Sequence, residues 1–73
     1  RSELRAGLAR ALGELPERER QILALSYEKE LTLAEIGQVM GVSESRISQL
    51  RAQAVTRLRS MLHEWLQKTS RAA

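Results

Sequence analysis

The sequence predicts an all-α domain of four helices, in which a tight turn joins the third helix to a long C-terminal helix. Ala, Leu, Arg, Glu and Gln, which favour helix, dominate the 73 residues, and Phe, Asp, Asn and Cys are absent. Apolar residues recur every three or four positions, which is the helical period. Thr32 and Ser43 stand where side chains typically cap a helix start. A chain of this length forms one small domain, so caps and tight packing matter.

The first two helices are expected over residues 2–13 and 16–27. The first carries leucines at helical spacing and can end at Gly13, because glycine readily adopts the left-handed conformation of a helix end. Pro16 suits the first position of the second helix, where an N–H would lack a partner, and the glutamates that follow suit the positive end of the helix dipole. These leucines are Leu4, Leu8, Leu12 and Leu15, and the glutamates are Glu17 and Glu19.

The third helix is expected over residues 33–40 and has both start and stop signals. Thr32 can accept from the backbone N–H of Glu35 while the Glu35 side chain reaches back to Thr32, which is the reciprocal capping box. Gly41 can end the helix in the left-handed conformation. Gly37 leaves room for another helix to cross closely, although alanine would favour helix more.

The fourth helix is expected over residues 44–67, with Ser43 as its cap and residues 68–73 as a frayed tail. About three residues then join two capped helices, which is the arrangement of a helix-turn-helix. One stripe of this long helix is apolar and is expected to face the core. The stripe consists of Ile47, Leu50, Ala54 and Leu58.

The opposite face of the fourth helix carries short polar or small residues. A merely solvated face usually carries Lys and Glu, and that interpretation is the alternative here. The observed face suits insertion into the major groove of DNA, where Gln can pair with adenine and Ser or Ala can lie near a thymine methyl. Ser45, Gln49, Ala52 and Thr56 point most directly away from the core stripe, with Ser48 and Gln53 on the flanks.

The net charge of +3 is unevenly distributed along the chain. Residues 1–42 hold six basic residues against seven glutamates, whereas residues 43–73 hold six basic residues against two glutamates. This excess along the fourth helix is expected where a helix lies against DNA phosphates. A membrane surface or a calmodulin-type partner would instead need a broad apolar stripe on the exposed face.

The residue types present do not indicate a catalytic site or a metal-binding site. The chain has no Cys and one histidine, His63, so a nucleophile relay or a metal cluster is not expected, and neither is a cofactor. No apolar run of membrane-spanning length and no signal peptide is recognisable, so a cytoplasmic protein is expected. The start at Arg1, without Met, suggests a domain of a longer protein.

The end of the fourth helix extends the apolar pattern. Trp65 has two interpretations, as a core residue or as the anchor of a protein partner. The candidate partner-binding residues are Met61, Leu62, Trp65 and Leu66.

Three segments of the chain together resemble region 4 of bacterial sigma factors, most closely the alternative sigma factors of the flagellar and sporulation group. The segments are LPERERQIL at 15–23, LTLAEIGQVMGVSESRISQL at 31–50 and AVTRLR at 54–59. The resemblance implies binding to the minus-thirty-five promoter element as part of an RNA polymerase sigma factor. It also implies contact with the flap tip of the polymerase β subunit, and an anti-sigma factor is a further expected partner.

The resemblance carries over to site residues only in part. Primary sigma factors read this element chiefly with Arg, Glu, Arg and Gln at the positions of Glu44, Ser45, Ser48 and Gln49, and of these only Gln49 is retained. A base preference different from the housekeeping one is therefore expected. Ser26 stands where the family has an arginine that contacts the DNA backbone.

Two sets of DNA-contacting residues follow. Glu44 keeps two interpretations, because its carboxylate can accept from cytosine N4 or simply favour the helix N-terminus. Thr32, Ser43 and Arg46 stand at helix starts, where side chains approach phosphates. The base-reading set is Glu44, Ser45, Ser48, Gln49 and Ala52, and the backbone-contacting set is Thr32, Ser43, Arg46 and Gln53.

Two alternatives remain on the sequence alone. Response regulators of the quorum-sensing type share Leu-x-x-Arg-Glu-x-x-Ile-Leu before a similar helix pair, but typically carry Lys-Thr-Val-x-x-His where this chain has SRISQL at 45–50. The other alternative is a module that is bound by an anti-sigma factor or by polymerase rather than by DNA.

Overall fold

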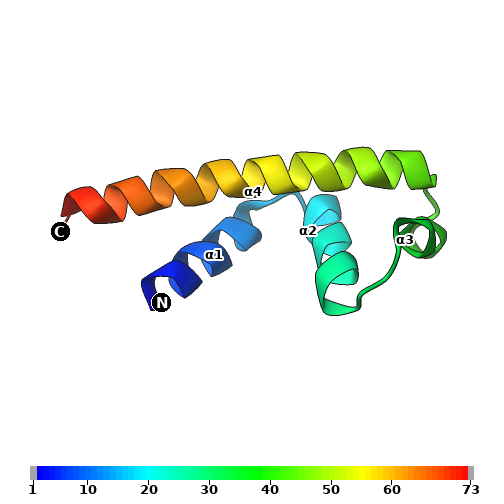
Figure 1. Ribbon diagram of the computed structural model, residues 1–73, viewed down its shortest axis with the longest axis horizontal. Helices are drawn as coiled ribbons and strands as arrows, with labels where there is room; N and C mark the ends of the chain where they lie inside the picture. The colour runs from blue at the N-terminus through cyan, green and yellow to red at the C-terminus, as the bar shows by residue number, and fades with distance from the viewer. Residues whose placement is uncertain (1, 73) are drawn as a thin grey trace.

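Three short helices lie side by side beneath one long helix (Figure 1). The computed structural model describes the backbone of residues 2–72 and the side chains of residues 5–68. In that part the helices are α1 (Ser2–Glu14), α2 (Glu17–Leu23), α3 (Leu33–Met40) and α4 (Glu44–Ala72), and a π-helical segment, η1 (Ala24–Glu28), continues α2. The described residues contain no strand, so the predicted all-α fold with four helices is confirmed.

Three isoleucines form the centre of the main core. Ile22 of α2, Ile36 of α3 and Ile47 of α4 each have no exposed surface, and Leu50 of α4 packs with them. Half-buried residues close the cluster at its edges. Because each of three helices contributes one β-branched side chain with few allowed rotamers, their relative orientation is tightly constrained. The closing residues are Leu25, Leu31, Leu33, Met40 and Val42.

A second apolar cluster joins α1 and α2 to the middle of α4. Leu15, Leu23 and Ala54 are buried at its centre. Leu12, Val55, Leu58 and Met61 are half-buried around it. The apolar stripe predicted for the long helix therefore faces both clusters, with only Leu58 not fully buried.

The turn between α3 and α4 is built by local hydrogen bonds. Thr32 Oγ1 accepts from the Glu35 N–H at 3.1 Å, and Glu35 Oε1 accepts from the Thr32 N–H at 2.8 Å, so the capping box is present. Gly41 ends α3 with a left-handed φ of 69°. Ser43 Oγ accepts from the Arg46 N–H at 3.1 Å and caps α4. These contacts form the predicted helix-turn-helix.

Gly37 allows the closest backbone approach within this turn. A Cβ atom at Gly37 would lie 2.5 Å from the carbonyl oxygen of Val42, so alanine, which helix propensity would favour, does not fit. Val42 itself is half-buried. Val39, near the end of α3, is 65% exposed.

Several helix ends differ from the predicted ones. Gly13 lies inside α1, which ends at Glu14 without a left-handed glycine; Arg20 Nη1 donates to the Gly13 carbonyl at 3.4 Å and so supports that end. Pro16 precedes α2 with an extended ψ of 143° instead of occupying its first turn. Helical backbone continues to Ala72, beyond the expected end at residue 67, while residue 73 and the Leu4 side chain lie outside the described residues.

The four helices pack into an elongated body of 45 × 19 × 15 Å, whose long dimension follows α4 (Figure 1). In the described part of the chain, no helix combines the length and apolarity needed to cross a bilayer.

We expect Gly37→Ala to destabilise the fold by about 1–3 kcal/mol, because the added methyl must displace a backbone carbonyl. Gly13→Ala is the matched control, since nothing lies within 4 Å of a Cβ there and Ala favours helix by about 0.5–1 kcal/mol. Urea denaturation followed by circular dichroism compares the two free energies of unfolding. Equal stability of the two variants would contradict the close approach at Gly37.

Candidate nucleic-acid interface

The outward face of the first half of α4 is polar and fully accessible. The base-reading candidates Glu44, Ser45, Ser48, Gln49 and Ala52 are all exposed, as is Gln53. The opposite face of the same turns is buried in the isoleucine cluster. The helix therefore presents short polar side chains on a firmly held backbone, which is what reading a major groove requires.

Four of the five candidate base-reading residues divide between two shallow hollows, and Gln49 lines neither of them. Glu44, Ser45 and Ser48 share one with Leu33, where the starts of α3 and α4 meet. Ala52 and Gln53 line the other, one to two turns further along α4. Contact with DNA at either hollow stays a prediction.

The two cap residues at the helix starts remain exposed. The Oγ atoms of Thr32 and Ser43 accept backbone N–H groups, and a hydroxyl that accepts still has its own proton to donate. Either hydroxyl can thus cap its helix and donate to a phosphate oxygen at the same time. At Thr32, the carboxylate of Glu35 lies beside the N-terminus of α3 and opposes an anion there.

Arg46 and Gln49 are joined in the structure, although the sequence suggested separate roles for them. Arg46 Nη1 donates to Gln49 Oε1 at 3.3 Å, across one turn of α4. Both side chains are exposed on the outer surface of the helix. A candidate phosphate contact thus touches the candidate base reader, which a spacing of three residues on a helix allows.

Glu19 pairs with Arg57, a contact that the sequence analysis missed. Glu19 is 4% exposed, and Arg57 reaches it with two hydrogen bonds of 3.0 and 3.2 Å. The carboxylate raises the pKa of Arg57, chiefly through these hydrogen bonds and then through charge attraction. The available signal was the position of Glu19 one turn from both Leu15 and Leu23, on the apolar side of its helix.

Arg51 is likewise engaged inside the fold. Its Nη2 donates to the Tyr27 hydroxyl at 2.6 Å, and its guanidinium carbon lies 5.3 Å from the centre of the Tyr27 ring. Of the basic residues after position 42, Arg51 and Arg57 thus serve contacts between helices. The charge excess predicted to face phosphates is correspondingly smaller, and Arg46 is the basic residue on the first turn of α4.

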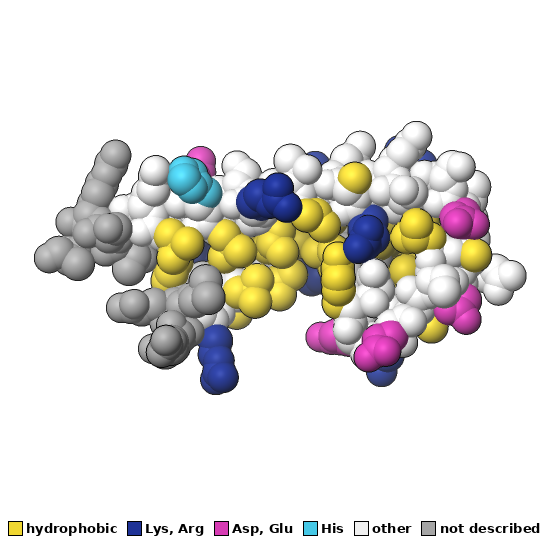
Figure 2. All heavy atoms as spheres, in the orientation of Figure 1, with side chains coloured by type: hydrophobic (Ala, Val, Ile, Leu, Met, Phe, Trp, Pro, Cys, Tyr) yellow, Lys and Arg dark blue, Asp and Glu magenta, His cyan; other side chains and the backbone are white. Residues whose placement is uncertain are grey.

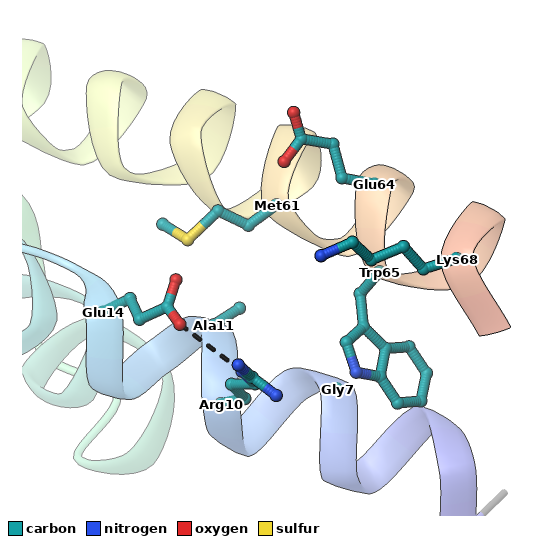
Figure 3. Close-up of a pocket in the computed structure, with 8 residues that line it drawn as sticks. All are labelled: Gly7, Arg10, Ala11, Glu14, Met61, Glu64, Trp65 and Lys68. Atoms are coloured by element: carbon teal, nitrogen blue, oxygen red, sulfur yellow. Dashed lines mark ion pairs between the residues drawn. The ribbon is translucent and has the colours of Figure 1, made fainter.

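Two of the four candidate partner-binding residues near the end of α4, Met61 and Trp65, line a cleft between α4 and α1. Figure 3 shows the Trp65 indole lying over Gly7, where a Cβ would come within 2.6 Å of the ring. Met61 points into the same cleft of about 220 Å³ and also packs on the second apolar cluster. Leu62 is half-buried, and Leu66 is 45% exposed. This geometry favours the core interpretation of Trp65.

An apolar groove runs between α1, α2 with η1, and the middle of α4. Figure 2 shows hydrophobic side chains gathered beneath α4 in this region. The groove has a volume of about 540 Å³, and Leu8 and Tyr27 on its walls are 38% and 59% exposed. Its other apolar residues are Leu12, Leu23, Ala24, Val55 and Leu58. The sequence analysis missed this groove, because it forms only where three helices meet.

The fold and the exposed recognition face define a helix-turn-helix protein of the kind that reads DNA. Residues 11–60 match the family described as Sigma-70, region 4, and the chain belongs to this family. This membership argues against the alternative that the chain is the DNA-binding domain of a response regulator. Among the described residues, no three His, Cys, Asp or Glu side chains gather as a metal site would require.

Curated relatives agree with the family. The chain is 60% identical over 60 residues to RNA polymerase sigma factor FliA of Pseudomonas aeruginosa, covering 82% of this chain and 24% of the relative. It is 52% identical over 61 residues to FliA of Escherichia coli K12, covering 84% and 26%. It is 45% identical over 67 residues to RNA polymerase sigma-D factor of Bacillus subtilis, covering 92% and 26%. The chain thus spans about a quarter of the length of these relatives. No solved structure matches it.

We expect Arg57→Ala to lower the thermal midpoint clearly, because it leaves the buried Glu19 carboxylate without its partner. Arg59→Ala, which removes an exposed arginine two residues on, should leave the midpoint nearly unchanged. Adding Glu19→Gln to the Arg57→Ala variant should restore part of the loss by removing the buried charge. If the single and double variants melt together below the parent chain, the ion pair is not the cause of the loss.

Proposed function

We propose that this chain binds the minus-thirty-five element of bacterial promoters as region 4 of an RNA polymerase sigma factor. Membership of the region 4 family and the FliA and sigma-D relatives support this function. The observation that carries it is the accessible polar face of α4, opposite a stripe that includes the fully buried Ile47. The chain would act as a binding module, not an enzyme, and would work with polymerase in the cytoplasm.

Recognition would divide between positioning and reading. Thr32, Ser43, Arg46 and Gln53 would contact phosphates and fix the register of α4 along the groove, without reading sequence. The reading residues, Glu44, Ser45, Ser48, Gln49 and Ala52, would then meet base edges.

The base preference should differ from that of primary sigma factors, because small serines replace charged readers at two positions. Ser45 and Ser48 can donate or accept and tolerate a thymine methyl nearby. Glu44 either accepts from cytosine N4 or only favours the N-terminus of α4. Its place beside Ser45 and Ser48 in one hollow is compatible with both roles.

A second proposed role is attachment to the polymerase core. We propose that the flap tip of the β subunit, the partner implied for region 4, occupies the apolar groove around Leu8 and Tyr27. Support comes from the partly exposed apolar side chains there, because an apolar helix face binds in such a groove. Trp65 and Met61 are packed against α1, so they fit this role less well than the groove does. An anti-sigma factor that covers the domain would block promoter binding.

Gln49→Ala should cost about 1–3 kcal/mol of discrimination between a matched and a scrambled promoter element, because it removes the hydrogen bonding of the amide to a base. Gln53→Ala is the matched control, since a backbone contact affects both duplexes alike. Fluorescence anisotropy titrations at two salt concentrations measure all four affinities. Equal losses on both duplexes for Gln49→Ala would contradict base reading by this residue.

Leu8→Glu should weaken binding of the chain to RNA polymerase core at least about tenfold, because it puts a charge into an apolar contact. Val39→Glu is the control, because Val39 is exposed on α3, outside the groove. Both variants should retain promoter affinity and helical circular dichroism. Unchanged core binding by Leu8→Glu, or an equal loss with Val39→Glu, would rule out the groove as the docking site.

A further inference from the structure

The hydrogen bond between Arg46 and Gln49 restricts which DNA base the Gln49 side chain can recognise. A glutamine amide has an acceptor, Oε1, and a donor, Nε2, and a free exposed amide can turn over to offer either one. Here Arg46 Nη1 donates to Oε1 at 3.3 Å, so Oε1 is turned toward Arg46. The donor Nε2 is then the group left to meet a base edge.

We propose that Arg46 is a specificity-determining positioning residue, which fixes the Gln49 amide so that it requires a base with an acceptor and disfavours cytosine. This inference rests on the proposed function, because it concerns how the same face of α4 reads a promoter. It adds a role to the phosphate contact expected for Arg46.

The hydrogen-bonding patterns of the bases give the direction of the effect. In the major groove, adenine offers N7 as an acceptor beside its N6 amino donor, so N7 can accept from Nε2 while Oε1 stays bonded to Arg46. Cytosine offers only its N4 amino donor there, which leaves Nε2 without an acceptor. Turning the amide to present Oε1 to cytosine would break the bond to Arg46.

The arrangement of neighbouring charges supports a dedicated role for Arg46. Arg51 and Arg57, the next two arginines on α4, are held by Tyr27 and Glu19 respectively. Gln53, one turn beyond Gln49, has no such arginine one turn before it, because position 50 is a leucine. The chain therefore contains a constrained glutamine and a matched comparison on the same helix.

The test uses Arg46→Lys, which keeps the positive charge and hence the contribution of counterion release, but replaces the planar donor fork by a flexible ammonium. Affinities are measured for duplexes carrying each of the four bases at every position of the promoter element. The position where Gln49→Ala abolishes base preference identifies the base that Gln49 meets. Arg59→Lys is the control for the arginine-to-lysine change.

With the parent chain, cytosine at that position should bind roughly tenfold or more weakly than adenine. In Arg46→Lys this ratio should fall by about fivefold, whereas Arg59→Lys should keep the parental ratio. If Arg46→Lys keeps the parental cytosine penalty while Gln49→Ala removes it, the inference is overturned and the proposed function stands. If the parent chain prefers no base at any position, the proposed function fails, and the inference with it.

A second measurement, without DNA, tests the hydrogen bond itself. The side-chain NH₂ resonances of Gln49 should shift in the ¹⁵N spectrum of Arg46→Lys, whereas those of Gln53 should not. An unchanged Gln49 side-chain resonance would overturn the inference whatever the DNA result.

Discussion

The contact of Ile22, Ile36 and Ile47 holds α2, α3 and α4 together, and the proposed reading of DNA by α4 depends on it. None of the three has exposed surface, so a change in the angle of one helix would open the core between all of them. Gly37 lets α3 approach the start of α4 closely enough for this contact. The polar outer face of α4 is therefore presented at one fixed angle, although the residues on it make few contacts within the protein.

Charge within the fold serves two purposes. Arg57 satisfies the buried Glu19 carboxylate and ties α4 to α2, and Arg51 ties α4 to Tyr27 at the end of η1. These arginines orient the helix, so sequence-independent attraction to phosphates falls more heavily on Arg46 at its start. The proposed reading face, which consists of Ser, Gln and Ala residues and Glu44, would gain selectivity from hydrogen-bond geometry more than from attraction to phosphates.

The features that the sequence predicted are those that local rules decide. The capping box at Thr32, the cap at Ser43 and the apolar stripe of α4 depend on residues within one or two turns, so helical spacing was enough to find them. Contacts between distant segments could not be predicted, because the spacing of residues in the sequence does not show which helices pack against each other. The Glu19–Arg57 pair, the stacking of Trp65 on Gly7 and the apolar groove all depend on the positions of α1 and α2 along α4. The base contacts themselves stay predictions.

In the proposed function, the first turns of α4 read DNA while the groove beneath the middle of α4 stays free for a protein. Backbone amide shifts of the ¹⁵N-labelled chain, titrated with a promoter duplex and with a scrambled duplex at equal salt, test this directly. Chemical-shift changes specific to the promoter duplex should cluster from Ser45 to Ala52, and the amide shifts of Leu8 and Leu58 should not change. Promoter-specific shifts centred on Leu8 and Leu58, or identical shifts with both duplexes, would contradict it.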